Sequence, residues 1–448
     1  MTITSSDLEV KTLGACRIAS PLAVRLGARR TSQHYVDEGD RVLFDDTLTM
    51  VTERGVPVDQ LPGFEPAGPR KKIYFDPSKI RVGIVTCGGL CPGLNDVIRA
   101  LVIQLHRHYG ARRIVGFRNG YRGFIAKYGD PVMELNPEAV AGIDERGGTI
   151  LGTSRGRQDP EEIVDCLERM DVNVVFVIGG DGSMRGASQI AQIALKRDDN
   201  IAVVGIPKTI DNDIPFIDHS FGFQTAFGQA AESLRSARVE ARSAPNGIGL
   251  VKVMGRHSGF IACSAALAKG DADFVLIPEV QFDLDGTGGL LAALRQRVQQ
   301  RGHAVVVVAE GAGQEYLADG PDSVDASGNV RLRDIGSLLR KRIIEDFAAA
   351  GVDLNMRYFD PSYLIRSVPA DPYDSMFCSR LAHAAVHAAM AGRTEVVVGR
   401  WHGRFVHLPM QLICAGRSQV SPDGDLWLSV LEATGQPQRF TSTPVPAR

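Results

Sequence analysis

The sequence contains no long basic run and no long apolar run, and each absence excludes a class of protein. Its 50 basic and 52 acidic residues nearly cancel, which argues against a nucleic-acid-binding surface. No apolar stretch is long enough to cross a bilayer, and residues 1–10 lack the basic start and apolar middle of a signal peptide. We therefore expect a cytoplasmic protein that has no nucleic-acid partner and no membrane partner.

The chain also lacks a cysteine framework. Its seven cysteines are scattered and odd in number, as in a reduced cytosolic protein. Cys87 and Cys91 form a close pair, but no second pair completes a zinc site, so they are interpreted as packing residues beside a glycine turn. His383 and His387 have metal-ligand spacing, yet no acidic signature accompanies them, and a packed alanine-rich helix is favoured.

What the chain does contain is an alternation of strand-like and helix-like segments. Apolar, β-branched runs at 80–86, 172–178, 201–206 and 304–309 alternate with helical patterns such as 184–196. This order indicates crossover units and a mostly parallel sheet. A chain of 448 residues is too long for one ordinary core and suits two α/β domains.

A glycine-rich corner, Gly179–Ser183, lies between the strand-like run 172–178 and a helical pattern. Glycines allow the sharp turn at little steric cost, and the start of the following helix is a natural place for a phosphate group. An acid beside a phosphate is repulsive, so Asp181 makes sense if a Mg²⁺ ion lies between the two.

Two further corners have the same character. Cys87–Asp96 follows one strand-like run, and Pro207–Asp213 follows another. Because ligands of parallel sheets bind at the carboxyl ends of the strands, these corners are expected to form one site. Phosphoryl transfer needs a backbone cradle, an acid to hold the metal, a base and cations. The candidates, in that order, are Gly88, Gly89 and 180–183; Asp181; Asp211 or Asp213; and Arg155 or Lys208.

Less specific interpretations stay open for these residues. A glycine-rich turn after a strand is often only a tight turn, and Asp211 and Asp213 have the composition of a helix cap or a turn. Two acids one residue apart, beside a lysine and at a strand end, weaken that interpretation. Arg256 and Arg366 are surface charges in the simplest view, although each lies in a loop beside a glycine or a strand.

Taken together, these segments resemble the phosphofructokinases, and most closely their atypical ATP-dependent branch. The matching segments are Cys87–Asp96, Gly147–Gly156, Gly179–Ser183, Pro207–Asp213, Met254–Gly259, Glu310 and Pro361–Arg366. The resemblance implies two three-layer α/β domains with mostly parallel sheets and the active site between them. The expected divisions are an N-terminal extension and linker (1–75), a nucleotide-binding domain (76–222 plus 367–415), a sugar-phosphate-binding domain (223–366) and a C-terminal tail (416–448).

The resemblance also implies a role for each matching position. ATP and fructose 6-phosphate would be the substrates, Mg²⁺ the cofactor, and phosphorylation of the sugar O1 the committed step of glycolysis. Catalysis is assigned to Asp211, Arg155 and Asp213, and Mg²⁺ to Asp181. ATP is assigned to Gly88, Gly89, Arg155, Gly156, Gly180, Asp181, Gly182 and Ser183. The sugar phosphate is assigned to Thr209, Ile210, Asp211, Met254, Gly255, Arg256, Glu310, Arg357, Tyr363, Leu364, Ile365 and Arg366.

Donor choice is assigned to Gly182 and Lys208. The resemblance pairs glycine at the first position with ATP users and lysine at the second with pyrophosphate users, and this chain carries both. An Asp side chain at 182 would intrude on the inner phosphate of ATP, so glycine favours ATP. Pyrophosphate-dependent transfer, a kinase resembling NAD kinases, and a non-catalytic nucleotide sensor are the alternatives.

Subunit contacts follow the family only in part. Its typical bacterial members donate an arginine to the neighbouring sugar site, but Asn246–Leu250 has no basic residue, and Arg357 takes the position of the other such contact. A homodimer or homotetramer under allosteric control is expected.

Overall fold

We describe the protein from a computed structural model, which describes residues 3–22, 35–53, 55, 57–317 and 331–442. These residues fall into two compact units. The first unit contains the described residues up to Thr209 together with Ile214–Gly222 and Val368–Arg417. The second unit contains Ile210–Asp213, Phe223–Ser367 and residues 418–442. The chain therefore passes between the units several times.

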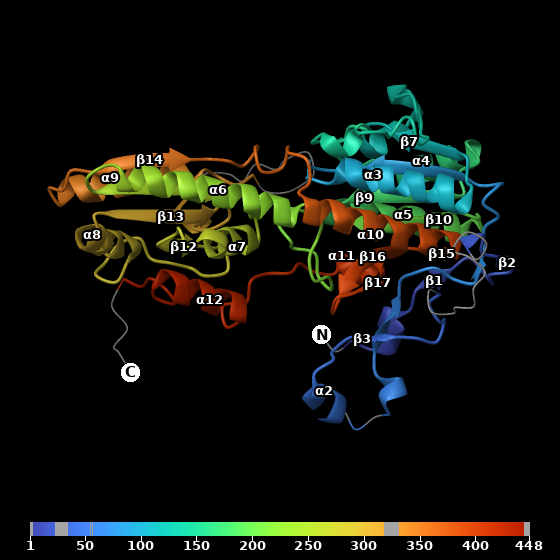
Figure 1. Cartoon of the computed structure of the whole chain (residues 1–448), viewed down its shortest axis with the longest axis horizontal. Coiled ribbons are helices and arrows are strands. Elements are labelled where there is room, and N and C mark those ends of the chain that lie inside the picture. The colour runs from blue at the N-terminus through green and yellow to red at the C-terminus, as the bar shows by residue number, and fades with distance from the viewer. Residues whose placement is uncertain (1–2, 23–34, 54, 56, 318–330, 443–448) are drawn as a thin grey trace. The chain divides into compact units, whose positions relative to one another are not determined.

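The first unit is built on a sheet with the strand order β3-β4-β17-β16-β10-β9-β6-β7-β8 (Figure 1). The five strands from β16 to β7 are parallel to one another, and the strands outside them are antiparallel to their neighbours. The strands of this sheet are β3 (Val42–Leu43), β4 (Gly63–Pro66), β6 (Arg81–Thr86), β7 (Arg113–Phe117), β8 (Met133–Glu134), β9 (Val174–Gly179), β10 (Ala202–Pro207), β16 (Val396–Trp401) and β17 (Arg404–Pro409). Two small antiparallel pairs join β1 (Lys11–Thr12) to β15 (Arg393–Thr394) and β2 (Ile18–Ala19) to β5 (Lys72–Ile73).

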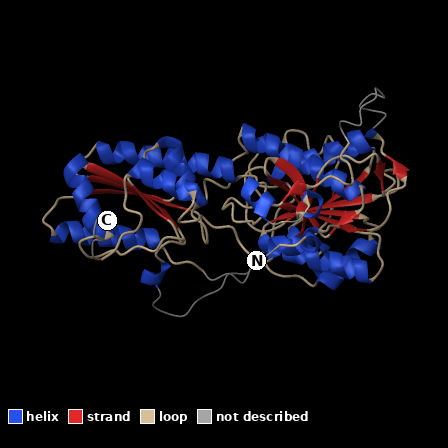
Figure 2. Ribbon diagram, turned by 90° about the horizontal axis from the view of Figure 1, so that it is seen from below, coloured by secondary structure: helices blue, strands red, loops and turns tan. Residues whose placement is uncertain are grey.

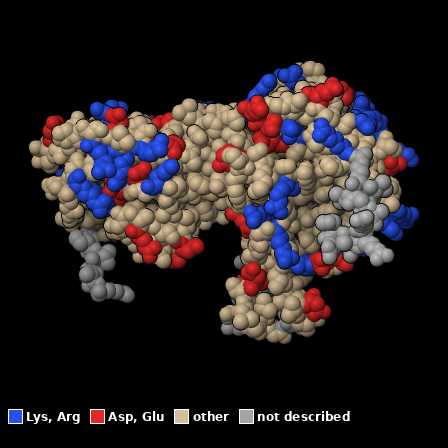
Figure 3. Space-filling model, viewed as in Figure 1, with Lys and Arg blue, Asp and Glu red and all other residues tan. Residues whose placement is uncertain are grey.

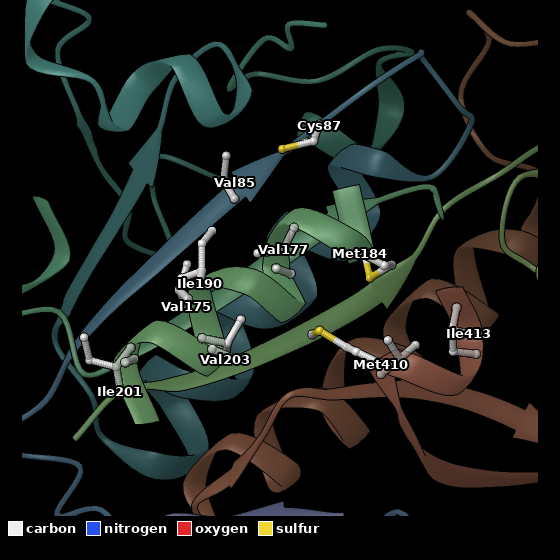
Figure 4. Packing of buried hydrophobic residues seen from close by; sticks show 14 of the residues in the cluster. Val85, Cys87, Val175, Val177, Met184, Ile190, Ile201, Val203, Met410 and Ile413 are labelled. Carbon is white, nitrogen blue, oxygen red and sulfur yellow. The ribbon is translucent and has the colours of Figure 1, made fainter. Parts of the chain in front are cut away.

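Helices cover the two faces of this sheet, as Figure 2 shows for both units. They are α3 (Leu94–Ile103), α4 (Pro160–Arg169), α5 (Asp181–Lys196), α10 (Pro372–Met390) and α11 (Met410–Cys414), and a π-helical turn, η4 (Gln104–Tyr109), continues α3. The short helix α2 (Leu48–Glu53) lies in the N-terminal extension. Because both faces are covered, the central strands are apolar throughout instead of alternating with polar residues. Figure 4 shows one side of this core, where residues of β6, β9 and β10 pack against α5 and α11.

The second unit has a sheet of four parallel strands in the order β12-β13-β11-β14. Its strands are β11 (Gly247–Val253), β12 (Phe274–Leu276), β13 (His303–Ala309) and β14 (Asn355–Phe359). Its helices are α6 (Phe223–Arg242), α7 (Phe260–Lys269), α8 (Leu290–Arg301), α9 (Ile335–Ala349) and α12 (Asp425–Thr434). The expected architecture of two α/β domains with mostly parallel sheets is thus confirmed.

The structure differs from the sequence expectations at both ends of the chain. Part of the expected linker forms β4, which adds to the large sheet beside β17. Part of the expected C-terminal tail forms α12, which packs on the second unit and buries Trp427 and Val430. In both places a few apolar residues become buried against the protein, which stabilises the segment. The many turn-forming residues around them hide this pattern in the sequence.

Charged side chains of both signs are interspersed on the face of each unit seen in Figure 3, in line with the near-even composition. Within the described ranges, none of the helices has the length and apolar character that a membrane crossing requires.

A buried ionic cluster ties the N-terminal extension to the rest of the first unit. Glu65 on β4 accepts hydrogen bonds from Arg70 at 2.7 Å and Arg393 at 3.0 Å, and it lies 3.2 Å from His407 on β17. The side chains of Arg70 and Arg393 are only 2% and 8% exposed, whereas Glu38 at the rim of the cluster is 58% exposed. Glu65 therefore supplies the buried counter-charge for two buried guanidinium groups.

We expect Glu65→Ala to destabilise the first unit by about 3–5 kcal/mol, because it leaves two buried cations short of their partner. Glu38→Ala is the matched control, since removing an exposed carboxylate costs about 0–1 kcal/mol. Denaturant unfolding of both variants measures the difference. Equal losses for the two variants would contradict the central role of Glu65.

Candidate active site

In the first unit, three turns meet at the carboxyl ends of β6, β9 and β10. The register aligns the ends of these neighbouring strands, with Pro207 opposite Gly179. Lys208 donates a hydrogen bond from Nζ to the carbonyl of Gly89 at 2.5 Å, and its backbone N–H donates to Gly179 at 3.0 Å. The Thr153 hydroxyl donates to the carbonyl of Gly88 at 2.6 Å. Backbone and side-chain contacts thus hold the glycine turn, Lys208 and the loop that carries Arg155 together.

Gly88 needs its glycine for conformation, because its φ of +82° lies in the left-handed region. The loop before Arg155 is held by Asn95, at the start of α3. The Asn95 side chain donates to the carbonyl of Arg146 at 3.0 Å and accepts from the N–H of Ile150 at 2.9 Å. Asn95 lies inside the Cys87–Asp96 segment, but its tie to a loop some fifty residues later is visible only in the structure.

Asp181 lies in the first turn of α5, where Gly180 is the N-cap residue. Unbonded N–H groups and the positive end of the helix dipole make such a turn a favourable place for an anion. The Asp181 carboxylate forms a bidentate ion pair with Arg185, and Arg417 approaches it to 3.3 Å. Sequence reasoning missed both arginines, although Arg185 follows Asp181 at the i,i+4 spacing of a helical ion pair.

Among the residues that the structure describes, no three His, Cys, Asp or Glu side chains are grouped so as to hold a metal ion. A Mg²⁺ ion that binds together with phosphate groups usually takes one or two carboxylates and completes its shell with phosphate oxygens and water. The carboxylate of Asp181, at a helix start suited to phosphate, fits that set of ligands.

In the second unit, the segment Ile210–Asp213 turns tightly between the two acids. Asn212 has a φ of +55°, a left-handed conformation that asparagine tolerates better than most residues. The hydroxyl of Ser258, a fully buried residue, donates to the backbone carbonyl of Asp211 at 2.9 Å. Ser258 follows the Met-Gly-Arg segment, so the segment that carries Arg256 also fixes the backbone of Asp211.

The Asp211 carboxyl has a strongly altered acidity. Burial raises its pKa to about 7, with further increases from the negative charges of Asp213 and Glu310, while Arg256 acts in the opposite direction through its charge and its backbone N–H. A carboxyl group with a pKa near neutrality is suited to accept a proton at physiological pH. Besides burial, the charges of two acids and one arginine of the second unit therefore set the pKa of Asp211.

Glu310 and Arg256 follow the ends of the neighbouring strands β13 and β11. The N–H of Glu310 donates to the carbonyl of Val253 at 2.9 Å, which keeps the two strand ends in register. Burial raises the pKa of Glu310, and the positive charges of Arg256 and Lys252 counter this increase.

The loop after β14 forms a single turn at Pro361–Arg366. The N–H of Leu364 donates to the carbonyl of Pro361 at 2.8 Å. Tyr363 and Leu364 are 75% and 68% exposed, while Ile365 is fully buried. The guanidinium group of Arg366 lies over the Tyr363 ring, 4.6 Å from its centroid. The loop thus presents an aromatic ring and an arginine, anchored by one isoleucine.

Two residues assigned to the sugar phosphate stand apart from this arrangement. Ile365 is buried, so its side chain serves the loop and has no exposed surface for a ligand. Arg357 lies opposite Gly249, five positions before Met254, which is ~16 Å along the strand at the usual rise per residue. Its side chain pairs with Glu240 of α6 at 3.4 Å. Within one chain, Arg357 does not reach the strand ends that carry the other candidates.

The remaining candidates form two groups, one in each unit. The first unit groups Gly88, Gly89, Gly180, Asp181, Gly182, Ser183, Lys208 and Thr209 at or after the carboxyl ends of β6, β9 and β10, and Arg155 and Gly156 lie in the loop before α4 that contacts Gly88. The second unit groups Ile210, Asp211, Asp213, Met254, Gly255, Arg256, Glu310, Tyr363, Leu364 and Arg366. Sequence reasoning missed residues that hold the candidate segments in place, and they include Ser258, Asn95 and Lys252.

Comparison with known proteins places these features in a family context. Residues 81–389 match the family model described as Phosphofructokinase. An ATP-dependent 6-phosphofructokinase of Amycolatopsis methanolica is 58% identical over 98% of this chain and 97% of its own. The enzyme of the same name from Borreliella burgdorferi is 46% identical over 96% of this chain and 97% of its own.

Solved structures agree in fold. A pyrophosphate-dependent phosphofructokinase from Marinobacter aquaeolei matches with a TM-score of 0.64 at 21% identity, over 79% of this chain and 91% of that chain. A phosphofructokinase from Pichia pastoris matches with a TM-score of 0.62 at 23% identity, over 80% of this chain and 37% of that chain. At such identities, the likeness shows the fold alone.

The fold itself does not require glycine at 182. The residue lies exposed in the first turn of α5, and a Cβ added there meets nothing within 4 Å. At Gly179, in contrast, a Cβ would overlap the side chain of Ser183. We expect Gly182→Ala to raise the free energy of unfolding by about 0.5–1 kcal/mol, because alanine loses less backbone entropy in a helix.

Gly179→Ala is the matched comparison and is expected to destabilise by about 1–3 kcal/mol through overpacking. Denaturant unfolding of the two variants measures both effects. A loss of stability in Gly182→Ala would mean that the fold itself selects glycine at this position.

Proposed function

The chain belongs to the phosphofructokinase family, and we propose that its active site transfers the γ-phosphoryl group of ATP to O1 of D-fructose 6-phosphate. The products are ADP and fructose 1,6-bisphosphate, and this reaction is the committed step of glycolysis. Two relatives that match nearly end to end, at 58% and 46% identity, are named ATP-dependent 6-phosphofructokinases. The observation that carries the mechanism is the place of Asp211, whose backbone accepts a hydrogen bond from Ser258 in the segment of Arg256 and whose surroundings raise its pKa to about 7.

Asp211 acts as the general base. It accepts the proton of the sugar O1 hydroxyl as that oxygen forms a bond to the γ-phosphorus and the bond to the leaving ADP oxygen breaks. Asp213 raises the affinity of Asp211 for the proton, and Arg256 limits that increase. The hydrogen bond from Ser258 to the Asp211 backbone keeps the base in place.

The first unit binds the nucleotide. The turns at Gly88, Gly89, Gly156 and 180–183 cradle the phosphates, and α5 adds the positive end of its dipole. Arg155 stabilises charge on the transferred group. Asp181 would hold Mg²⁺, which neutralises phosphate charge when it is bound. Arg185 and Arg417 pair with this carboxylate and orient it.

The second unit binds fructose 6-phosphate. Arg256 and Arg366 grip its 6-phosphate, since a guanidinium group forms paired hydrogen bonds with phosphate oxygens. Glu310 and the exposed turn at Tyr363 contact the sugar. Arg357 completes a sugar site in a neighbouring subunit of a homodimer or homotetramer, which accounts for its distance from the strand ends of its own chain. We place the enzyme in the cytoplasm.

ATP is the donor that we favour over pyrophosphate. Gly182 leaves open space in the first turn of α5, where an Asp side chain would add bulk and negative charge against the inner phosphates of ATP. Lys208 is compatible with either donor. The pyrophosphate-dependent neighbours are only 19–21% identical to this chain, whereas the named ATP users reach 58%.

Replacing Asp211 by Asn should lower kcat by at least ~10²-fold, which is the usual scale for losing a general base, and should change either KM little.

In the parent, kcat/KM for fructose 6-phosphate should fall below pH ~7, because protonated Asp211 cannot accept a proton. Asp213→Asn should move that decline to lower pH, since it removes a charge that raises the Asp211 pKa. Near-parental turnover in Asp211→Asn would refute its role.

A coupled assay with ATP and pyrophosphate as alternative donors tests the function directly. The parent should use ATP, and Gly182→Asp should weaken kcat/KM for ATP strongly while the protein stays folded. Gain of pyrophosphate activity is not required, because removing a preference does not build a new site. The steric account fails if the parent prefers pyrophosphate or if Gly182→Asp uses ATP as well as the parent does. Gly182→Ala separates the effect of bulk from that of charge.

A further inference from the structure

Lys252 forms a charged link in the second unit that the proposed mechanism does not use. It lies on the central strand β11, two residues before Met254, and its side chain is only 14% exposed. Its Nζ lies 3.1 Å from Asp334 and 2.9 Å from Asp360. One ammonium group therefore joins the strand that leads to Arg256 with the starts of two other segments.

Each of the two carboxylates holds the start of a segment. Asp360 accepts hydrogen bonds from the N–H of Ser362 at 3.2 Å and from its hydroxyl, which fixes the start of the turn at Pro361–Arg366. Asp334 is the N-cap of α9 and accepts from the N–H of Gly336 at 3.1 Å. Lys252 thus reaches the base of the loop that carries Tyr363 and Arg366.

We propose that Lys252 is a positioning residue for fructose 6-phosphate, which holds the Asp360–Arg366 loop in its binding conformation without touching the substrate. This inference rests on the proposed function of that loop. Without the ammonium group, Asp334 and Asp360 face each other as like charges, and Glu310 nearby loses a cation that stabilises its ionised form. The loop would then open or shift, and Arg366 would lose its fixed place.

Because Lys252 acts on one substrate site, its loss should change one kinetic constant. Lys252→Met keeps most of the aliphatic stem and removes the charge. It should raise KM for fructose 6-phosphate about tenfold, on the scale of one charged hydrogen bond, and leave KM for ATP within about twofold. Lys252→Arg restores the charge and should return KM for fructose 6-phosphate close to the parental value.

A matched control is Lys269→Met, because Lys269 pairs at 3.2 Å with Glu232 on the surface of the same unit and should change neither KM. Arg366→Ala is the reference for direct loss of a contact with the sugar phosphate, and it should raise the same KM further. Asp360→Asn should reproduce the Lys252→Met effect, and the double variant should show little more than either single change, since both break one link. Asp334→Asn should act mainly on the stability of α9.

Hydrogen exchange of the substrate-free enzyme gives a readout besides activity. In Lys252→Met, amides of residues 362–366 should exchange several-fold faster than in the parent, because the turn has lost its anchor. Unchanged exchange together with a raised KM would mean that Lys252 contacts the substrate and does not act by positioning.

The inference is also overturned if KM for fructose 6-phosphate stays within twofold, if both KM values rise alike, or if only kcat falls. Should Lys252→Met fail to fold, Asp360→Asn and Lys252→Arg carry the same test, and an unchanged KM in Asp360→Asn overturns it. A parent that does not phosphorylate fructose 6-phosphate with ATP would refute the proposed function itself, which is a separate outcome.

Discussion

The chemistry proposed for this protein depends on one electrostatic constraint, the burial of the Asp211 carboxyl beside two other acids. Burial and the charges of Asp213 and Glu310 disfavour its ionised form, and Arg256 partly offsets them. A carboxyl group held in this balance accepts a proton near neutral pH, whereas an exposed aspartate would stay ionised and be a poor base. The tight turn at Asn212 and the aligned strand ends of the second unit hold these charged residues in place.

In the proposed mechanism the first unit works differently, since it binds phosphate at glycine turns and at the start of a helix. Glycine turns follow β6 and β9, and Lys208 bridges from the end of β10 to the turn after β6. Asp181 brings a negative charge to this corner, and Arg185 and Arg417 balance that charge. Positive side chains thus surround the carboxylate that we propose as the Mg²⁺ ligand.

Both units contain ion pairs between residues that are not proposed to contact a substrate. Lys252 joins β11 to the starts of two segments, and Glu65 in the N-terminal extension pairs both with Arg70 beside it and with the distant Arg393. Such pairs add little stability at the surface, but once partly buried they fix the position of the segments that they link. Loops that bind ligands need this support, because they have few apolar contacts of their own.

The sequence by itself determined the two α/β domains, the parallel strands and the corners after the strands at 172–178 and 201–206. Those features follow from local rules, because apolar runs, glycine turns and helix starts report only on their neighbours in the chain. Only the tertiary structure decided that Ile365 is buried, that Arg357 lies far from the strand ends, and that α12 packs as a helix. The ion pairs of Lys252 with Asp360 and of Asp181 with Arg417 join residues that are distant in sequence, and the raised pKa of Asp211 depends on burial. No local sequence pattern encodes these features.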